Sequence, residues 1–348
     1  MKCIRPNYIN DFQCNGKSCQ SRCCKGWRIV VDDETYQKYC HIEDDIQRQE
    51  ILSKLELLDS DKFFIKMNEN LNCPFLTEDS LCILQKKYGE EFLTAICHSY
   101  PRVTYRIGDI LEQSLTLTCP IAARIILLQK ETIKFETVEI NEPHLTFNWS
   151  NKINLPLEDA INLQMSSISI LQDRNFLFNE RLFRLCLLMS DEFVEEVNFD
   201  IDNHAKVMID IFCKIYNANM DDSKKKNLRK TYVNYHEIIL TRLMNEYNNI
   251  FENYMVNEFF MRCYPFTFNG GIWENCKIFI IGVKAMEFAI VLTAISKNGL
   301  VTADEFLDMI DAINEKLDHN RNGMKFICDT AEQIHDLKTF VDMMIDVY

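Results

Sequence analysis

The stretch at residues 14–24 reads Cys14-Asn15-Gly16-Lys17-Ser18-Cys19-Gln20-Ser21-Arg22-Cys23-Cys24. It places four cysteines within eleven positions, in the spacing C-x4-C-x3-C-C. The glycine and the small polar residues between them indicate irregular backbone, which can turn several thiolates toward one centre. The sequence therefore predicts that the first third of the chain is built around a metal site.

A second set of cysteines follows at wider spacing. Cys73 and Cys119 each precede a proline, which favours extended backbone at both positions. With the first set they give eight candidate metal ligands: Cys14, Cys19, Cys23, Cys24, Cys73, Cys82, Cys97 and Cys119. Of the 15 cysteines, the other seven are expected to be bystanders, and the five of these beyond residue 119 are expected to be buried small hydrophobic residues.

The spacing bears on which metal such a site holds. Thiolate-only sites select zinc, copper(I) or iron–sulfur clusters. Structural zinc ligands usually come in pairs two to four residues apart, and neither cysteine set divides in that way. Iron–sulfur sites accept irregular spacing and a distant ligand. The pattern favours an iron–sulfur cluster, leaves zinc as the alternative metal and places a disulfide frame third. One cluster with spare thiols and two clusters both remain open.

Composition narrows the classes of partner. The formal net charge is -14, which disfavours binding to nucleic acid or to an anionic membrane and suits a lysine-bearing protein. The first residues lack the apolar segment of a secretion signal, so we expect a cytoplasmic protein with reduced thiols. The apolar run 278–294 is interrupted by Lys284 and Glu287, which predicts a buried core helix and no membrane span.

Hydrophobic periodicity predicts a mainly α fold with two domains. Residues 1–134 are predicted to form a cysteine-rich α+β metal-binding domain, residues 135–155 an extended linker, and residues 156–348 an all-helical domain. Within the first domain we expect mostly loop over 1–35, short strands at 27–32 and 63–67, helices over 33–58 and 84–97, and a hairpin over 102–117. In the second domain, Thr302 and Glu305 match a capping box that starts a helix.

Several enzyme signatures are missing. Only nine glycines are present and none are spaced G-x-G, so a Rossmann-type nucleotide loop is not expected, and the sequence also lacks a P-loop. Cys19 and Cys23 begin the C-x3-C-x2-C run of radical enzymes that use S-adenosylmethionine, but the next cysteine follows immediately. If the protein is an enzyme, its metal centre must carry much of the chemistry.

The combined pattern resembles the flagellin lysine-N-methylase family, whose cysteine-rich part belongs to a wider group of zinc- or iron-chelating domains. The matching motifs run from residue 6 to about residue 124 and include Cys19-x3-Cys23-Cys24-x2-Trp27, Cys73-Pro74-Phe75-Leu76, Tyr88-Gly89-Glu90, Cys97-x2-Tyr100-Pro101-Arg102 and Leu115-x3-Cys119-Pro120. A looser likeness continues through Asn179-Glu180-Arg181-Leu182 and through residues 252–265.

This resemblance implies a function. The family methylates the ε-amine of surface lysines on flagellin, with S-adenosylmethionine as donor and a [4Fe-4S] cluster. The eight cysteines carry over as candidate ligands, Arg102 as a cofactor-binding cation beside the cluster, and Trp27 as a shielding aromatic residue. The expected partner is flagellin or another lysine-bearing protein.

The reacting lysine must be neutral, so desolvation or a base has to remove its proton. Candidate carboxylates are Asp32, Glu90, Glu91 and Asp109, while His98 beside Cys97 is expected to support the site and not to bind metal. Two rival functions stay open: a non-catalytic zinc- or iron-binding interaction module, and a thiol redox sensor that uses the Cys23–Cys24 pair.

Overall fold

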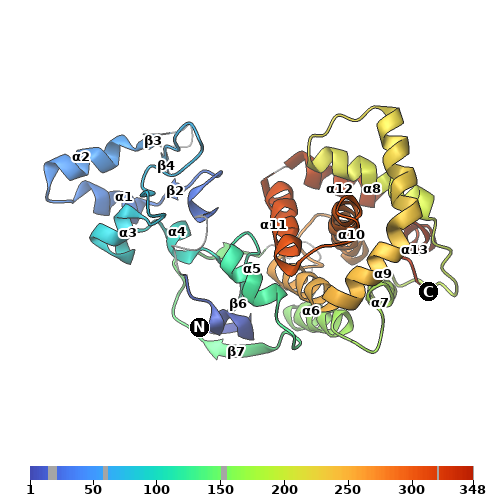
Figure 1. Ribbon diagram of the computed structural model, residues 1–348. Coiled ribbons are helices and arrows are strands. Elements are labelled where there is room, and N and C mark those ends of the chain that lie inside the picture. Colours follow the sequence, from blue (N-terminus) through green and yellow to red (C-terminus); the bar gives the residue numbers. More distant parts are fainter. Residues whose placement is uncertain (15–21, 58–61, 150–154, 320, 348) are drawn as a thin grey trace. The chain divides into compact units, whose positions relative to one another are not determined.

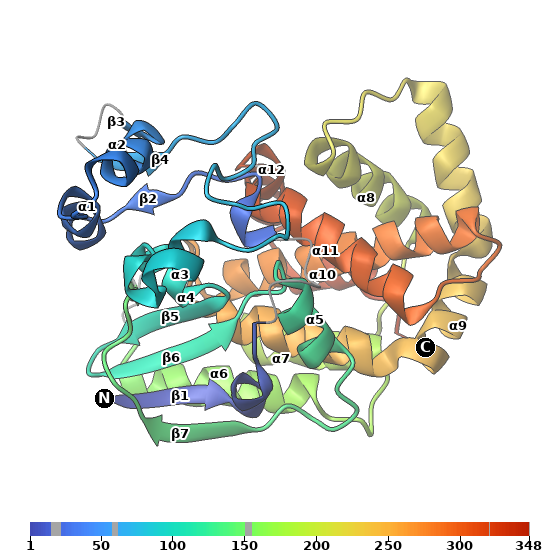
Figure 2. The same ribbon diagram turned by 60° about the vertical axis from the view of Figure 1, so that its left-hand side comes forward.

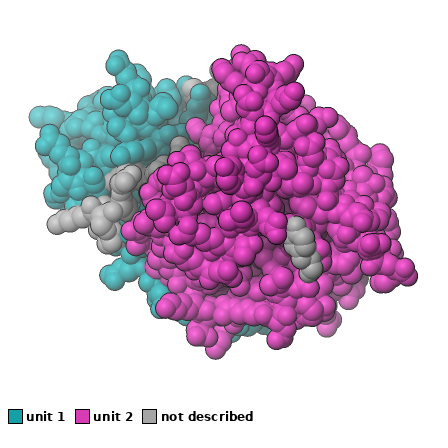
Figure 3. Space-filling model, turned by 45° about the vertical axis from the view of Figure 1, so that its right-hand side comes forward, with its two compact units in different colours: residues 1–122, 135–148 teal, residues 123–134, 149–348 magenta. Residues whose placement is uncertain are grey.

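The computed structural model describes residues 1–14, 22–57, 62–149, 155–319 and 321–347. Across these residues the chain is mainly helical, with two small sheets. It divides into two compact units (Figure 3). Unit 1 comprises residues 1–122 and 135–148, and unit 2 comprises residues 123–134 and 149–348.

Unit 1 contains a five-stranded sheet in the order β7-β1-β6-β5-β8. Its strands are β1 (Lys2–Pro6), β5 (Arg102–Ile107), β6 (Ile110–Leu115), β7 (Phe135–Glu139) and β8 (Phe147–Asn148). Figure 2 shows β5, β6, β1 and β7 side by side. The predicted hairpin is confirmed as β5–β6, and Gly108 takes a positive φ of 61° at its turn, where a side chain would be strained.

The cysteine-rich part of unit 1 packs around a second, three-stranded sheet. Its strands are β2 (Val30–Val31), β3 (Leu55–Leu57) and β4 (Phe63–Ile65), and the helices beside it are α1 (Asp33–Cys40), α2 (Asp45–Ser53), α3 (Ile83–Tyr88) and α4 (Ala95–Ser99). Short 3-10 turns cover Asn7–Asp11, Arg22–Cys24 and Glu90–Phe92. The small core includes Ile29, Tyr39 and Phe75, and Cys24, Cys82 and Cys97 pack against it.

Four local predictions in unit 1 differ from the structure. The loop expected over 1–35 contains β1, which pairs with β6 and β7 far along the chain. The helix expected over 33–58 is interrupted, because Asp44 caps a new helix and β3 follows it. The helix expected over 84–97 ends at Gly89, which has a φ of 93°. Part of the segment expected as a linker is extended but forms the edge strand β7.

Unit 2 is helical. Its helices are α6 (Leu157–Leu171), α7 (Phe178–Ser190), α8 (Ile201–Ile215), α9 (Asp222–Met261), α10 (Ile272–Ser296), α11 (Ala303–His319), α12 (Arg321–Gln333) and α13 (Leu337–Met344), and α5 (Pro120–Leu127) enters it from unit 1. The predicted capping box at the start of α11 is confirmed, since Thr302 and Glu305 bond each other's backbone N–H groups. Helix α9 is broken at Tyr247, whose φ is -127°.

Helix α10 lies in the middle of unit 2 (Figure 1), where it contacts α7, α8, α9, α11, α12 and α13. It is also the one helix of the described residues that is long and apolar enough to cross a membrane. Most of it is buried inside the unit, so the prediction of a core helix is confirmed. The charges that interrupt its apolar run pair with each other, with Lys284 Nζ 2.7 Å from Glu287 Oε2.

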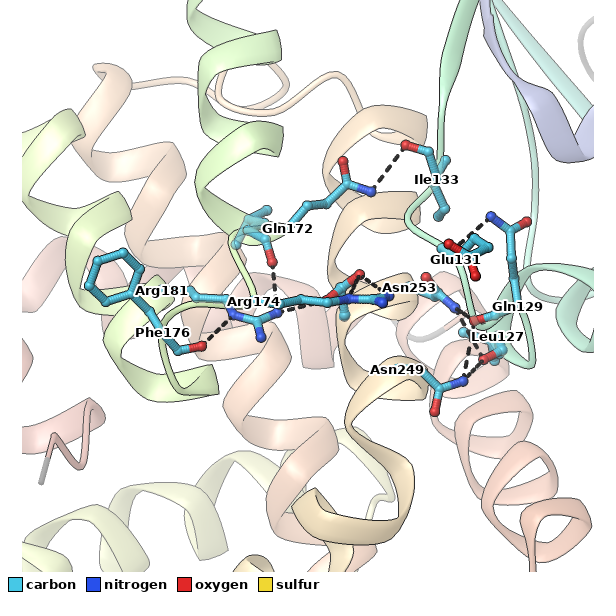
Figure 4. Close-up of polar contacts among 12 residues, drawn as sticks. Leu127, Gln129, Glu131, Ile133, Gln172, Arg174, Phe176, Arg181, Asn249 and Asn253 are labelled. Carbon is cyan, nitrogen blue, oxygen red and sulfur yellow. Dashed lines mark hydrogen bonds and ion pairs between the residues drawn. The ribbon is translucent and has the colours of Figure 1, made fainter.

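The segment 123–134 belongs to unit 2 and is held there by side-chain amides (Figure 4). Asn253 Nδ2 donates to the carbonyl of Gln129 at 2.7 Å, and Gln172 Nε2 donates to the carbonyl of Ile133 at 3.1 Å. These bonds satisfy carbonyl groups that have no helical partner. The chain therefore passes between the units three times, near residues 122, 134 and 148.

Candidate metal centre

Unit 1 contains a cavity of about 1020 Å³ whose walls collect most of the predicted ligands. Seven of the eight cysteines line it: Cys14, Cys23, Cys24, Cys73, Cys82, Cys97 and Cys119. The eighth, Cys19, lies outside the described residues. The structure thus brings together thiols that are up to 105 positions apart in sequence.

Backbone pairing explains how Cys24 and Cys73 meet. The N–H of Cys73 donates to the carbonyl of Cys24 at 2.8 Å, and the N–H of Gly26 donates to the carbonyl of Leu71 at 2.9 Å. Gly26 has a φ of 81°, which a residue with a Cβ adopts at a cost. The glycine after the Cys23–Cys24 pair therefore lets the first cysteine segment lie antiparallel to the second.

Two short turns place the remaining thiols of this group. The bridge between Leu76 and Cys82 closes a tight turn that returns the chain from Cys73, and Cys82 lies at the N-cap of α3. Cys97 lies in α4, whose N-cap Thr94 accepts a hydrogen bond from the Cys97 N–H at 3.2 Å. Each cysteine is thus held at a turn or a helix end next to the small core.

The thiols of this inner group (Cys23, Cys24, Cys73, Cys82 and Cys97) influence one another electrostatically. The Sγ atoms of Cys23 and Cys24 are 3.7 Å apart, and their contact lowers the pKa of Cys23 to about 7 and raises that of Cys24. Burial raises the pKa of Cys73 to about 11 and that of Cys97 to about 12, and neighbouring thiolates add to both effects. A metal bound here would have to displace protons from these thiols.

The described thiols can be compared with the ligand geometry of a single metal ion. Among the described residues, no three His, Cys, Asp or Glu side chains are arranged to hold a single metal ion. Four thiolates around one zinc are separated by about 3.8 Å, since each Zn–S bond is about 2.3 Å. Cys23 and Cys24 reach that separation, but no third described ligand joins them. The inner thiols line one cavity beside an apolar core, and soft sulfur donors of this kind are the ligand type that zinc, copper(I) and iron–sulfur clusters select.

Arg102 and Trp27, which the family resemblance singled out, also line the cavity. The Arg102 guanidinium lies 5.2 Å from the ring centroid of Phe12, a cation–π contact, and both side chains face the cavity. Trp27 donates its indole N–H to the carbonyl of Cys23 at 3.0 Å and lies against Tyr100. Arg102 thus provides a positive charge in the same cavity as the thiols, and Trp27 fixes the Cys23 backbone.

The candidate carboxylates differ in whether they line the cavity. Glu90 lines the cavity, whereas Glu91, Asp109 and Asp32 do not. Asp32 instead caps α1 by accepting from the Thr35 N–H at 3.0 Å, and its second oxygen accepts from the Ala95 N–H at 2.8 Å. Burial acts to raise the pKa of Asp32, but these N–H donors outweigh it and lower the pKa below its ordinary value. Asp32 therefore ties α1 to the helix that carries Cys97.

We expect Asp32→Ala to destabilise unit 1 by about 1 kcal/mol at neutral pH, since it removes a helix cap. The folded-state pKa of Asp32 is lowered, so its contribution is present above the unfolded pKa and is lost as pH falls through the folded pKa. The stability difference between wild type and variant should therefore shrink on acidification below about pH 4. Urea denaturation at several pH values measures it.

Asp44→Ala is the matched control, because Asp44 caps α2 through the Gln47 N–H and makes no bond to the α4 segment. It should cost similar stability but leave the metal content of the purified protein unchanged, whereas Asp32→Ala should lower that content. Equal metal content in the two variants would contradict the role of Asp32 in placing Cys97.

The cavity also contains residues that the sequence did not single out. Thr104 and Gln113 face it from opposite positions on β5 and β6, and Gln113 Nε2 donates to Thr104 Oγ1 at 3.0 Å. The His144 ring contacts that of His98, with ring centroids 3.7 Å apart and the ring planes tilted by 42°. Burial, and then the neighbouring His144, lower the pKa of His98. Alternation along the hairpin could have indicated the first pair, but no local signal marks His144, which lies in the segment expected as a linker.

Comparison with known proteins identifies the family of the chain. A family model described as the FliB lysine N-methylase C-terminal domain matches residues 193–345. The flagellar biosynthetic protein FliU of Salmonella muenchen is 36% identical over 126 residues, which cover 35% of this chain and 75% of that protein. The chain belongs to the flagellin lysine-N-methylase family.

Further relatives in this family are longer. The lysine-N-methylases of Salmonella typhimurium strain LT2 and Salmonella choleraesuis are each 36% identical over 126 residues. That match covers 35% of this chain and 31% of each enzyme, so it spans about a third of the length of these relatives. No solved structure gives a significant match to the chain.

Proposed function

We propose that this protein is a lysine N-methyltransferase that acts on flagellin, takes the methyl group from S-adenosylmethionine and holds a [4Fe-4S] cluster in its cysteine cavity. The observation that carries the proposal is the convergence of seven family-pattern cysteines on one cavity in unit 1. Membership of the family and the relatives named lysine-N-methylase support the reaction.

The inner thiols are the natural ligands for the cluster. We assign Cys73, Cys82 and Cys97, together with one of the adjacent Cys23 and Cys24, because these residues line one cavity beside the same apolar core. When bound, such a cluster supplies Lewis-acidic iron and a site that can exchange an electron. Trp27 and Phe75 line the cavity and belong to the apolar core beside these thiols.

The transfer itself sets requirements that the cavity walls can meet. The lysine nitrogen forms a bond to the methyl carbon while the sulfonium S–C bond breaks and leaves a neutral thioether. The amine must first lose a proton, since an ammonium has no lone pair. Glu90 and His144 line the cavity and can accept that proton, and burial of the lysine side chain lowers its pKa in the same direction.

A direct assay tests the proposal. Anaerobically purified full-length protein should contain iron and acid-labile sulfide, and should form methyl-lysine on flagellin when S-adenosylmethionine is added, as read by peptide mass mapping. Cys40→Ser is the matched control, because Cys40 lies in unit 1 outside the cavity. The Cys40→Ser protein should retain both iron and activity.

Two outcomes would overturn parts of the proposal. Absence of methyl-lysine under both oxidising and reducing conditions would remove the methyltransferase assignment. A colourless protein with stoichiometric zinc would replace the cluster with a structural zinc site, and would favour an interaction module.

A further inference from the structure

The cavity of unit 1 has a polar surface besides its thiols, formed by the hairpin β5–β6 (Figure 2). Arg102, Thr104 and Gln113 line the cavity, whereas their chain neighbours Val103 and Glu112 do not. Alternate residues of a strand point to the same side, and Thr104 is paired directly with Gln113 across the hairpin. One face of the hairpin therefore presents these three side chains to the cavity. We call Thr104 and Gln113 the hairpin pair.

The hairpin pair is buried and is joined by one hydrogen bond. Thr104 is 2% exposed and Gln113 is 8% exposed. Gln113 Nε2 donates to Thr104 Oγ1 at 3.0 Å, and among the described residues neither side chain has another hydrogen-bond partner. The Gln113 carbonyl oxygen is thus a free acceptor, and the Thr104 hydroxyl hydrogen is a free donor. Buried polar groups are normally paired, so the partners of these two must come from the cavity side.

A donor and an acceptor side by side match the edge of an adenine ring. The exocyclic amine of adenine donates a hydrogen bond, and the ring nitrogen next to it accepts one. Glutamine and asparagine side chains recognise adenine at these two positions in nucleic acids. Hypoxanthine has a carbonyl where adenine has the amine, so it would place an acceptor against the Gln113 oxygen. The hairpin pair should therefore distinguish the two purines.

Arg102 adds a positive charge on the same face of the hairpin. It is two residues from Thr104, a separation of about 7 Å along the strand. Its guanidinium lies over the Phe12 ring and makes no ion pair or hydrogen bond with a described side chain. A cation without a counter-ion attracts an anionic group on a ligand. The face thus suits a molecule that carries both an adenine ring and a carboxylate, as S-adenosylmethionine does.

We infer that the hairpin pair recognises the adenine ring of the methyl donor. Gln113 Oε1 accepts a hydrogen bond from the adenine amine, and the Thr104 hydroxyl donates one to the adjacent ring nitrogen. Arg102 binds the carboxylate of the same molecule. The inference rests on the proposed use of S-adenosylmethionine, and it assigns the donor subsite to the hairpin wall of the cavity. These residues determine which donor binds, and they take no part in the bond changes of methyl transfer.

Binding of the demethylated product tests the inference without any turnover. The probes are S-adenosylhomocysteine and S-inosylhomocysteine, which carry an amine and a carbonyl, respectively, at position 6 of the purine. Each is titrated into anaerobically purified full-length protein and followed by calorimetry. We expect S-adenosylhomocysteine to bind about tenfold more tightly. Gln113→Leu should bring this preference close to one, because it removes the acceptor, and Thr104→Val should weaken S-adenosylhomocysteine about fivefold.

Matched variants and ligands control for indirect effects. Thr137→Val makes the same change as Thr104→Val at an exposed position on β7 outside the cavity, and it should bind like wild type. Thr104→Ser keeps the hydroxyl and should bind more tightly than Thr104→Val. Arg102→Met should weaken S-adenosylhomocysteine but not adenosine, which lacks the carboxylate. ATP shares the adenine ring and should bind more weakly than S-adenosylhomocysteine, because the chain lacks a P-loop.

The outcomes separate the donor subsite from the methylation itself. Equal affinity of wild type for the two homocysteine probes, or an unchanged preference in folded Gln113→Leu, overturns the subsite. Tighter binding of ATP than of S-adenosylhomocysteine also overturns it, since the adenine ligand would then be a nucleotide. Adenine-selective binding that depends on Gln113, in a protein that forms no methyl-lysine, would support the subsite and reject the methyltransferase assignment. Methylation by Gln113→Leu with a wild-type KM for the donor would do the reverse.

Discussion

Replacing Cys97 by serine should abolish iron–sulfur loading of the protein. Cys97 is partly buried, is held by the Thr94 cap and lines the same cavity as Cys73 and Cys82. A serine oxygen is a poor ligand for iron in such a site, which selects soft donors. Affinity should fall by more than about 100-fold, because even residues that only support a ligand can cost that much.

Iron and acid-labile sulfide per chain, with the visible absorption spectrum, measure this loss without any assay of activity. Cys73→Ser and Cys82→Ser should behave like Cys97→Ser, and Cys40→Ser should match wild type. Circular dichroism shows whether each variant stays folded. If Cys97→Ser keeps full iron and sulfide while folded, the inner group does not hold the cluster.

Arg181→Met should be the most destabilising single change in unit 2. Arg181 is 1% exposed and its NH1 nitrogen is 2.8 Å from Glu252 Oε2, while Glu252 is itself fully buried. Arg181 also donates to the carbonyls of Phe176 and Leu171, as Figure 4 shows for Phe176. Breaking a buried pair on one side leaves a charge without compensation and costs about 3–5 kcal/mol.

Arg174→Met provides the comparison, since Arg174 binds the same carboxylate but is 41% exposed. Solvent screens that pair, so its loss should cost about 1 kcal/mol or less. Thermal unfolding should show a decrease in Tm of roughly 10 °C for Arg181→Met and much less for Arg174→Met. Similar Tm values for the two variants would show that burial does not determine how much stability each arginine–Glu252 ion pair contributes.

The cysteine pattern was informative because thiols are rare and their chemistry is specific. The seven candidates that lie in described residues line one cavity, although their role as ligands stays a prediction, and alternation around Gly108 predicts the β5–β6 hairpin. Which thiols approach one another was not readable. That depends on the pairing of segments such as Gly26 with Leu71, whose separation exceeds any local period.

Residues whose partners are distant in sequence also could not be recognised from the sequence alone. Strand β1 lies in a stretch predicted as loop because five residues whose buried members are Cys3 and Pro6 carry little periodic signal, and its partners are β6 and β7. Glu252 reads as an ordinary charge on an amphipathic helix until Arg181 is placed beside it. His144 reads as linker until β7 returns the chain to the sheet.

The threefold passage of the chain between its units limits how the gene can be divided. A fragment that stops near residue 150 would carry the segment 123–134 without Gln172, Asn249 and Asn253, whose amides hold its carbonyls. A fragment that starts there would lack the segment altogether. Recombination at a single breakpoint therefore cannot exchange one unit without part of the other, and exchange of the cysteine-rich unit alone requires two pieces of coding sequence to move together.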